Sequence, residues 1–439
     1  MIPTFRLYKP ASPSFNSTSK ANARVGSEQV THLFVAMYLK RIIQSVPCKP
    51  LPIPAKLLPT ADLVEEEHTP HYEPRHFYPV RLYEILNNRY QIAAKIGWGT
   101  SSTVWLARDL HQWRWLPPRY VAIKVNASNY TSQESAEKEL RITEHITKAN
   151  PQHPGRDFVA TLLDSFRVVS PGGTHICMVF DALCEPLWML KRRFEGNTIP
   201  LDVLKPVSKF ILEGLRYLHT ECHIIHTDLK SDNILLALRN PSVLDSVAQD
   251  EMNNPSPRKQ LDDRDIYLSR NYWKLSPDEL GRSIITDFGL AVRGDGPPNS
   301  HPIQPEGYRA PEVCLGDDWG YSVDIWNLGV MLWDLFYGHG PFDTPLNSRG
   351  SGSADEAHLG QIISLLGPLH LISSAGEKKH LGKFKFPELI GQKDLVSMAK
   401  EIDDDDGMPQ FVDFISRMLR WRPEDRTTPD DLLSHPWLP

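Results

Sequence analysis

Cysteine is scarce in this chain, which has five cysteines among 439 residues. Their number is odd and no two of them stand in a Cys-x-x-Cys pair, so the sequence predicts neither a disulfide framework nor a zinc site. Long apolar runs are lacking as well. The longest, from Leu33 to Leu39, is far shorter than the roughly 20 residues that span a bilayer. We therefore expect a soluble protein of a reducing compartment.

An excess of charge of one sign is also lacking, because the formal net charge is −6 and the pI is about 6.3. This balance favours neither a nucleic-acid binder nor a protein of the membrane surface. A hydrophobic content of 41% is enough to bury one large two-lobed domain or two ordinary domains. We expect a monomer with no direct nucleic-acid partner and no membrane partner.

Residues 1–71 are rich in proline, serine and threonine and have no sustained hydrophobic period, which predicts a disordered extension. Before Asp62 this extension has one acidic residue, Glu28, against eight lysines and arginines. A mitochondrial transit peptide has such a composition, and so does an ordinary acid-poor tail. Both interpretations stay open at this point.

Two kinds of hydrophobic period follow one another along the rest of the chain. Residues 90–96 alternate with a period of two, and similar runs at 103–107 and 120–125 predict two further strands. Later segments, such as 201–219 and 322–337, have the period of a helix. The predicted fold is α+β, with a small β-rich lobe before a larger, mainly helical lobe.

A glycine-containing turn follows the first predicted strand, in the string IGWGTSSTV over residues 96–104. Gly97 and Gly99 have no side chain, so the backbone there could fold over phosphates. Ser102 replaces the third glycine of the G-x-G-x-x-G pattern. Alone, this string is weak evidence, because an ordinary tight hairpin turn has the same composition.

Two charged residues stand at positions that otherwise look apolar. Lys124 lies in the strand-like string VAIK, where burial without a partner would lower the pKa of the ammonium and cost stability. Glu139 shares a helix face with Ile142 and Ile146. The two charges could therefore pair with each other. The alternative is a surface lysine and a solvated glutamate.

The string HTDLKSDN over residues 226–233 has the residue types that phosphoryl transfer needs. Asp228 can orient an attacking hydroxyl, Lys230 can neutralise the transferring phosphate, and Asn233 can bind a metal. Asp287 begins an Asp-Phe-Gly triplet and offers an oxygen ligand of the kind that Mg²⁺ prefers. An Ala-Pro-Glu triplet at 310–312 follows. These strings in this order are strong evidence for a kinase.

The order of these motifs resembles the eukaryotic protein kinases over residues 72–438. In its details the chain is similar to the SR-protein kinase family, and to its fungal members in particular. The strings that carry this resemblance are FYPVRLYEILNNRY, IGWGTSSTVWLARD, LLDSF, GTHICMVFDAL and HTDLKSDNILL. The resemblance implies the two-lobed protein kinase fold, with an N-lobe over about 72–183 and a C-lobe over about 184–438. It also implies a place in the cytoplasm and nucleus.

The resemblance implies roles for individual residues as well. Asp228 and Lys230 would be catalytic, with Asp228 as the base, and Asn233 and Asp287 would hold Mg²⁺. Phe180 would be the gatekeeper beside the adenine. The ATP-binding set would be Ile96, Gly97, Gly99, Val104, Ala122, Lys124, Glu139, Asp181 and Leu183. In the C-lobe, Glu312 would pair with Arg426, and Asp324 would anchor the catalytic loop.

A polar insert is predicted over about 239–280, because 54 positions separate Asn233 from Asp287 (287 − 233) and the metal-binding loop needs far fewer. SR-protein kinases have a spacer at this place that governs their location. A solvated loop without function is the alternative.

For the substrate, the resemblance implies arginine/serine-rich proteins. Asp232 lies beside the catalytic residues and Asp403–Asp406 forms an anionic run, so basic peptides would be attracted. A solvated loop is the simpler interpretation of that run. A pseudokinase scaffold that binds basic partners is the alternative function, although Lys124, Asp228, Asn233 and Asp287 are all present. A small-molecule kinase of the same fold would generally lack the Ala-Pro-Glu segment.

Two departures from common kinases concern regulation. Thr227 replaces the arginine that commonly precedes the catalytic aspartate, so the usual docking site for a phosphorylated activation loop is missing. Pro305 replaces a threonine that commonly stands three residues before Tyr308, which puts substrate contacts in that loop in doubt. The sequence thus predicts a constitutively active kinase.

Replacing Ser300 tests this hypothesis, because Ser300 and Tyr308 are the only hydroxyl side chains between Asp287 and Glu312. We expect Ser300→Ala to keep the transfer rate of the wild type in an assay with labelled ATP. A large rate increase when Ser300 becomes phosphorylated would contradict the hypothesis.

Overall fold

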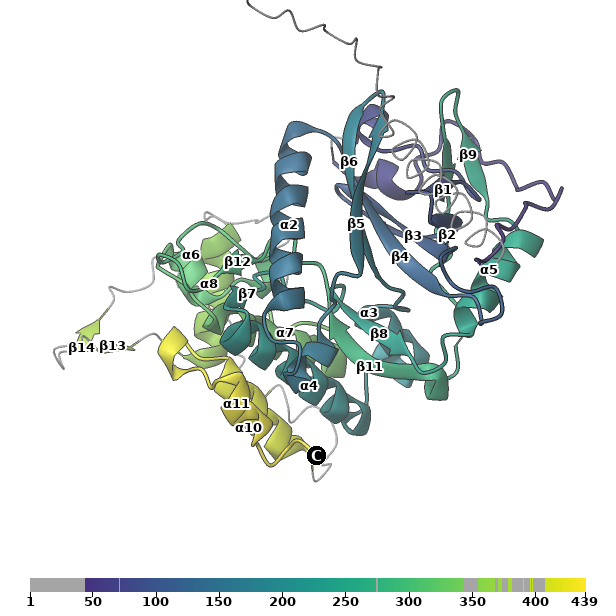
Figure 1. Ribbon diagram of the computed structural model, residues 1–439. Helices are drawn as coiled ribbons and strands as arrows, with labels where there is room; N and C mark the ends of the chain where they lie inside the picture. The colour runs from purple at the N-terminus through teal and green to yellow at the C-terminus, as the bar shows by residue number, and fades with distance from the viewer. Residues whose placement is uncertain are drawn as a thin grey trace, which may run out of the picture.

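The structure is a computed structural model that describes residues 44–70, 72–273, 275–342, 354–367, 370–372, 378–380, 390, 395, 397 and 407–439. These residues form two lobes, one built on a β-sheet and one mainly helical (Figure 1). The predicted α+β, two-lobed class is therefore confirmed. The run Asp403–Asp406 lies outside the described residues.

The N-lobe is built on a six-stranded antiparallel sheet with the order β1-β2-β3-β4-β6-β5. Its strands are β1 (Ile85–Leu86), β2 (Tyr90–Gly99), β3 (Ser102–Asp109), β4 (Tyr120–Asn126), β5 (Asp164–Ser170) and β6 (Gly173–Asp181). The six residues 90–95 of β2 are all buried, so both faces of this strand are covered. Alternation with a period of two had predicted only one covered face.

The helix α2 (Tyr130–Lys148) covers one face of the sheet, and Ala136 packs against Ile176 and Met178 of β6. Figure 1 shows α2 upright beside β5 and β6. From β6 the chain continues through Asp181–Leu183 into the C-lobe, so these residues form the hinge between the lobes.

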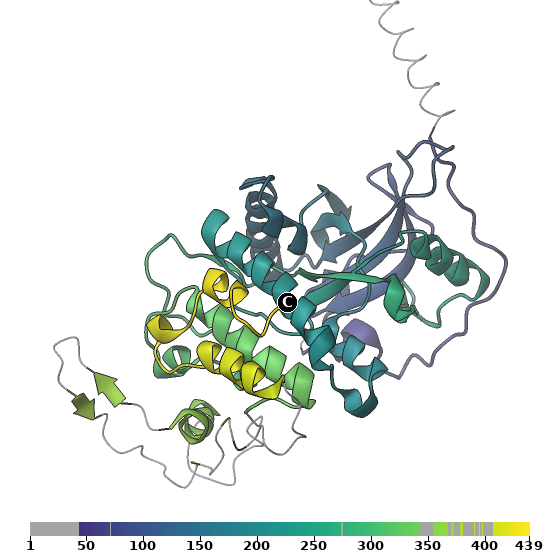
Figure 2. The ribbon, with the colours of Figure 1, turned by 90° about the horizontal axis from the view of Figure 1, so that it is seen from below.

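The C-lobe has one large hydrophobic core centred on α4 and α7. Seen from below, the C-terminal helices lie against this pair (Figure 2). The described helices that follow β6 in the chain are α3 (Leu187–Leu190), α4 (Leu201–Arg216), α5 (Val243–Asn253), α6 (Pro311–Leu315), α7 (Ser322–Tyr337), α8 (Ala354–Leu366), α10 (Met408–Met418) and α11 (Pro429–Leu433). The described strands that follow β6 are β7 (Ile224–Ile225), β8 (Ile234–Leu238), β9 (Arg258–Gln260), β10 (Asp265–Tyr267), β11 (Leu280–Ile285), β12 (Val292–Arg293), β13 (His370–Ile372) and β14 (Lys378–His380).

The predicted insert over 239–280 is folded rather than a solvated loop. It contains α5 and the β9-β10 hairpin, and both lie on the N-lobe, although the insert begins and ends in the C-lobe (Figure 1). The Tyr120 hydroxyl of β4 donates to the Asp245 carboxylate of α5 at 2.8 Å. Arg264 donates to the carbonyl of Phe77 at 3.0 Å. The polar composition of the insert therefore reflects contacts with the N-lobe.

The segment 44–70 also lies on the N-lobe, which differs from the disordered extension predicted over 1–71. Gln44 forms an isolated β-bridge with Trp113, and Leu57 forms one with Arg258 of the insert. A short 3-10 helix, Glu65–His68, then brings three glutamates to the sheet. Residues 1–43 lie outside the described part of the chain.

A buried charge cluster joins this segment, the insert and the sheet. Lys95 of β2 is 2% exposed and forms ion pairs with Glu66 and, at 3.5 Å, with Glu65. Lys259 of the insert is 3% exposed and donates to both oxygens of Glu67 at 2.8 and 2.9 Å. The Glu65 carboxylate accepts from the backbone N–H of Ser269 at 2.9 Å. The ammonium groups can stay buried because each has a carboxylate partner.

Removing one partner of the Lys95–Glu66 pair is expected to destabilise the N-lobe. Lys95→Met leaves Glu66 buried without its cation and should lower the free energy of unfolding by about 3 to 5 kcal/mol. The double variant Lys95→Met with Glu66→Leu removes both charges and should be less destabilised than Lys95→Met. Thermal unfolding of the three proteins measures this. A double variant that is less stable than Lys95→Met would contradict the assignment.

No helix among the described residues is long and apolar enough to cross a membrane.

Candidate active site

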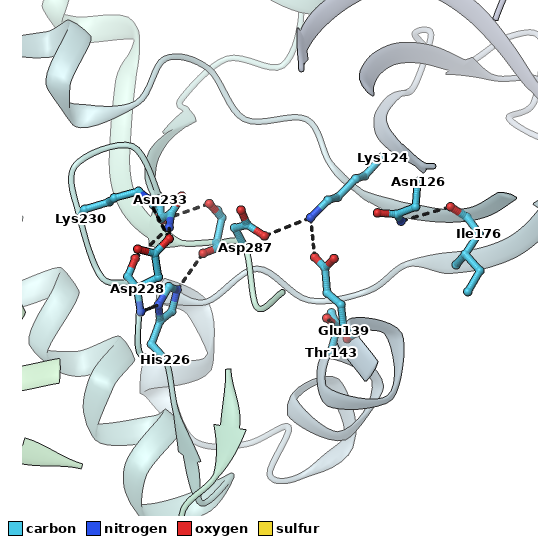
Figure 3. A network of polar contacts seen from close by, with 11 residues as sticks. Lys124, Asn126, Glu139, Thr143, Ile176, His226, Asp228, Lys230, Asn233 and Asp287 are labelled. Atoms are coloured by element: carbon cyan, nitrogen blue, oxygen red, sulfur yellow. Dashed lines mark hydrogen bonds and ion pairs between the residues drawn. The ribbon is translucent and has the colours of Figure 1, made fainter. Parts of the chain in front are cut away.

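Lys124 lies at the centre of a group of charges that joins the two lobes, in which Glu139 is buried and the Asp287 side chain is half-exposed. Its ammonium donates to Glu139 of α2 at 2.7 Å and to Asp287 of the Asp-Phe-Gly triplet at 3.0 Å (Figure 3). Glu139 is 5% exposed. The carbonyl of Glu139 accepts a hydrogen bond from the Thr143 hydroxyl at 2.8 Å, within the same helix. The strand β4, the helix α2 and the C-lobe thus meet at one ammonium group.

The three groups shift one another's pKa. Burial alone would lower the pKa of Lys124, but the carboxylates of Asp287 and Glu139 outweigh it and raise this pKa. The charge of Lys124 lowers the pKa of Asp287 to about 2, from an ordinary value of 3.8. Burial raises the pKa of Glu139, although Lys124 opposes it. Asp287 is therefore an anion at every physiological pH, as a metal ligand must be.

In the catalytic loop, Lys230 and Asn233 both donate hydrogen bonds to the carboxylate of Asp228. The Lys230 ammonium donates to Asp228 at 2.8 Å. The Asn233 amide nitrogen donates to the Asp228 backbone carbonyl at 2.8 Å and to its carboxylate at 3.0 Å. These bonds occupy the nitrogen of Asn233 and leave its amide oxygen available. In Figure 3 this group faces Asp287, so two oxygen donors of the kind that Mg²⁺ prefers lie on facing segments.

Asp324 of α7 anchors the catalytic loop, residues 226–233, through hydrogen bonds. Its carboxylate is fully buried and accepts from the backbone N–H groups of His226 at 2.8 Å and Thr227 at 2.9 Å. His219 also contacts it at 2.9 Å. Three polar contacts satisfy the buried carboxylate, which allows it to remain in the core.

Two residues of the site have left-handed backbone conformations that side chains disfavour. Thr227 has a φ of 67° and Asp287 a φ of 61°. Such conformations cost about 1 to 3 kcal/mol and persist where surrounding bonds enforce them. For Thr227 these include the bond to Asp324 and a hydroxyl that donates to the Leu290 carbonyl at 3.1 Å. The two strained residues are therefore Thr227, which directly precedes Asp228, and Asp287, the proposed metal ligand.

The residues expected to bind ATP line the N-lobe strands and the hinge. Across β2 and β3, Gly97 pairs with Val104 and Gly99 with Ser102. Across β4 and β6, Ala122 pairs with Phe180. Ile96 lies in β2, Asp181 ends β6, and Leu183 follows in the hinge. The structure thus brings the expected adenine and phosphate residues to neighbouring strands of one sheet.

The activation segment is held by Gln304, a residue that sequence reasoning missed. Gln304 has a φ of 67°, its amide nitrogen donates to Asn327 at 2.9 Å, and its amide oxygen accepts from the backbone N–H of Ala310 at 2.8 Å. Asn327 in turn donates to the carbonyl of Tyr308 at 2.8 Å. A polar residue next to Pro305 was the only available signal in the sequence, because Asn327, one of the partners of Gln304, lies 23 positions away on α7.

Glu312 and Arg426 form the buried pair that the resemblance implied. Two parallel bonds of 2.6 Å join the guanidinium to the carboxylate, and the side chains are 0% and 3% exposed for Arg426 and Glu312 respectively. Arg426 also lies over the ring of Trp326. This pair fixes the end of the activation segment to the C-terminal helices.

Comparison with known proteins agrees with this geometry. The family model described as the protein kinase domain matches residues 90–265 and 275–438. The chain belongs to the protein kinase family. Residues 266–274, which the model leaves unmatched, fall within the insert.

Relatives narrow this assignment to serine/threonine kinases. A serine/threonine protein kinase of Aspergillus fumigatus is 34% identical, over 91% of this chain and 98% of its own length. The serine/threonine-protein kinase SRPK of Physarum polycephalum is 33% identical, over 85% of this chain and 91% of its own. SRSF protein kinase 3 of Homo sapiens is 25% identical, over 88% and 93%. The chain is thus a protein serine/threonine kinase with SR-protein kinases among its relatives.

Asp228→Ala is expected to lower kcat by about 100-fold to 10,000-fold, which is the usual contribution of a positioned general base. The KM for ATP should change little, because the role expected for Asp228 is at the substrate hydroxyl and not at ATP. Steady-state transfer from labelled ATP measures both constants. An unchanged kcat would contradict a role of Asp228 in the chemical step.

Lys124→Met is expected to raise the pKa of Asp287 from about 2 towards its ordinary value of 3.8, because the charge that lowers this pKa most is then removed. In the wild type, the ionised carboxylate stabilises the fold above its unfolded pKa, and this contribution is lost as the pH falls towards 2. A carboxyl NMR titration of Asp287 measures the change. Equal pKa values in both proteins would contradict the electrostatic assignment.

Proposed function

We propose that this kinase phosphorylates serines in arginine/serine-rich proteins. The observation that carries the proposal is the similarity, along most of the chain, to kinases whose names include SRPK and SRSF protein kinase. Exposed acids beside the site agree with basic substrates. Asp232 lies four residues after Asp228, Glu306 lies in the activation segment, and both are exposed.

The residue roles that we propose follow from the positions described above. Asp228 orients the attacking hydroxyl and accepts its proton, and Lys230 neutralises the transferring phosphate. Lys124 holds the α- and β-phosphates, and Glu139 keeps Lys124 in place. Mg²⁺, when bound, would neutralise charge between the phosphates. The oxygens of Asp287 and Asn233 fit such an ion, because they are hard ligands on facing segments.

We also propose that the kinase is active without phosphorylation of its activation segment. The Lys124–Glu139 pair is formed at 2.7 Å. The Gln304 bonds to Asn327 and Ala310 hold the segment with no phosphate. The side chain of Thr227, which replaces the usual arginine, donates its hydroxyl to the carbonyl of Leu290.

Transfer from labelled ATP to three peptides tests the substrate proposal. We expect the highest kcat/KM for an arginine-serine repeat, a lower value for a lysine-serine repeat of the same length, and the lowest for a neutral peptide. Arginine should exceed lysine because a guanidinium can bind a carboxylate through two parallel hydrogen bonds. The Asp228→Ala variant shows which transfer belongs to this site.

Asp232→Asn is the matching change in the enzyme. We expect it to lower kcat/KM for the arginine-serine repeat several-fold and to leave the neutral peptide unaffected. Asp62→Asn, a change of an exposed carboxylate in the N-lobe, is the control. Equal transfer to all three peptides would refute the substrate class and leave the kinase activity standing. A wild type that transfers to none would favour a pseudokinase scaffold.

For localisation, we propose the cytoplasm and nucleus, with a mitochondrial location as the alternative that the acid-poor N-terminus supports. The protein would act as a monomer on its protein substrates, without direct nucleic-acid or membrane partners. Imaging of the full chain with a C-terminal fluorescent tag, with and without residues 1–43, separates the two locations. A mitochondrial signal that disappears with the deletion would overturn the proposal.

A further inference from the structure

A hollow of about 340 Å³ lies between the C-terminal half of α2 and the strands β7 and β12. Figure 1 shows these strands beside the lower part of α2. Its floor is apolar and consists of Ile142, Ile224 and Val292. Its remaining lining residues are Lys138, Arg141, His145 and Arg293. We name this hollow the α2 pocket. It lies outside the group of Lys124, Glu139 and Asp287, although α2 contributes to both.

Acidic residues are missing from the lining of the α2 pocket, whereas three permanent cations and one histidine are present. Lys138 is partly buried, and burial lowers its pKa with no carboxylate to oppose the effect. In the described part of the chain, neither Lys138 nor Arg141 has an ion pair or side-chain hydrogen bond. Arg293 pairs with Asp295 on the solvent side. Among the described residues, Lys138 and Arg141 therefore bring positive charge without an ion-pair partner to an apolar hollow.

The contact between His145 and Arg293 adds a further observation. His145 Nε2 lies 2.8 Å from the carbonyl of Cys222 and 2.7 Å from Nη1 of Arg293. One ring nitrogen can donate to the carbonyl or accept from the guanidinium, but it cannot do both. At least one of these contacts therefore lacks a proper hydrogen bond. An anion would supply an acceptor that Nη1 lacks.

We propose that the α2 pocket binds a phosphorylated serine or threonine side chain of a partner protein. A phosphate carries nearly two negative charges and three acceptor oxygens, which matches the neighbouring cations Lys138, Arg141 and Arg293 better than a carboxylate does. The apolar floor matches a hydrophobic residue next to the phosphorylated one, so a peptide fits better than free phosphate. A volume of about 340 Å³ is in the range of ligand sites.

The position of the pocket predicts coupling to ATP. Lys138 and Arg141 flank Glu139 on the same helix, so a phosphate held there favours the position of α2 in which Glu139 reaches Lys124. By linkage, ATP and the phosphopeptide should each raise the affinity of the other. The coupling would act through α2 and needs no phosphate on the activation segment.

Fluorescence polarisation of the full chain with a labelled peptide tests the proposal. The probe is a short neutral peptide with phosphoserine between two leucines, and its unphosphorylated form is the reference. We expect saturable binding of the phosphopeptide that weakens with salt, and at least tenfold weaker binding of the reference. Lys138→Ala and Arg141→Ala should each weaken binding about tenfold, which corresponds to the loss of one charge-assisted hydrogen bond.

Lys148→Ala is the matched control, because Lys148 is a lysine of the same helix that is 73% exposed and pairs with Glu144. It should bind the phosphopeptide as the wild type does, and the melting temperature of each variant shows whether it is folded. Equal affinity for both peptides, or equal losses in Lys138→Ala and Lys148→Ala, would overturn the proposal. Competition by millimolar inorganic phosphate that equals competition by the phosphopeptide would overturn the assignment to a peptide.

Discussion

The ammonium of Lys124 forms the ion pairs that join the two lobes. It joins β4 of the sheet, Glu139 of α2 and Asp287 of the C-lobe, which are up to 163 positions apart in the sequence. Lys124 or Glu139 would be costly to bury alone, and the two are stable together because each is the other's partner. The same arrangement keeps Asp287 ionised. The ion pairs of Lys124 therefore both hold the lobes together and keep Asp287 in the ionised form that a metal ligand needs.

The N-lobe is braced from its outer side by two segments that are not part of the sheet. The segment 44–70 and the insert meet at the buried lysines Lys95 and Lys259, and the backbone N–H of Arg270 donates to the carbonyl of Lys95 at 2.8 Å. Lys95 directly precedes Ile96, where the glycine-containing turn begins. These contacts therefore hold β2, the strand that leads into the glycine-containing turn expected to cover the phosphates. In a kinase that is active without an activation-loop phosphate, as proposed above, such contacts would hold the active conformation.

The sequence by itself determined the fold class and the order of the functional strings. Phosphoryl transfer restricts residue types at fixed spacings, so HTDLKSDN and Asp-Phe-Gly can be read without a structure. Hydrophobic period located the central strands, and the helix predicted over 322–337 has the bounds of α7. The helix predicted over 201–219 ends at Arg216 and continues as a π-helical turn, Tyr217–Glu221. Helix ends depend on local packing that a period does not contain.

Only the tertiary structure decided that residues 44–70, 239–273 and 275–280 are ordered. Their composition is that of solvated loops, and their order comes from partners far away in the chain, such as Glu67 for Lys259, 192 positions apart. The same holds for the contact of Gln304 with Asn327 of α7 and for the cations gathered at the α2 pocket. The hydrophobic pattern of a segment indicates which of its residues face solvent and which face the core. It does not indicate which distant residue will form an ion pair with a buried charge.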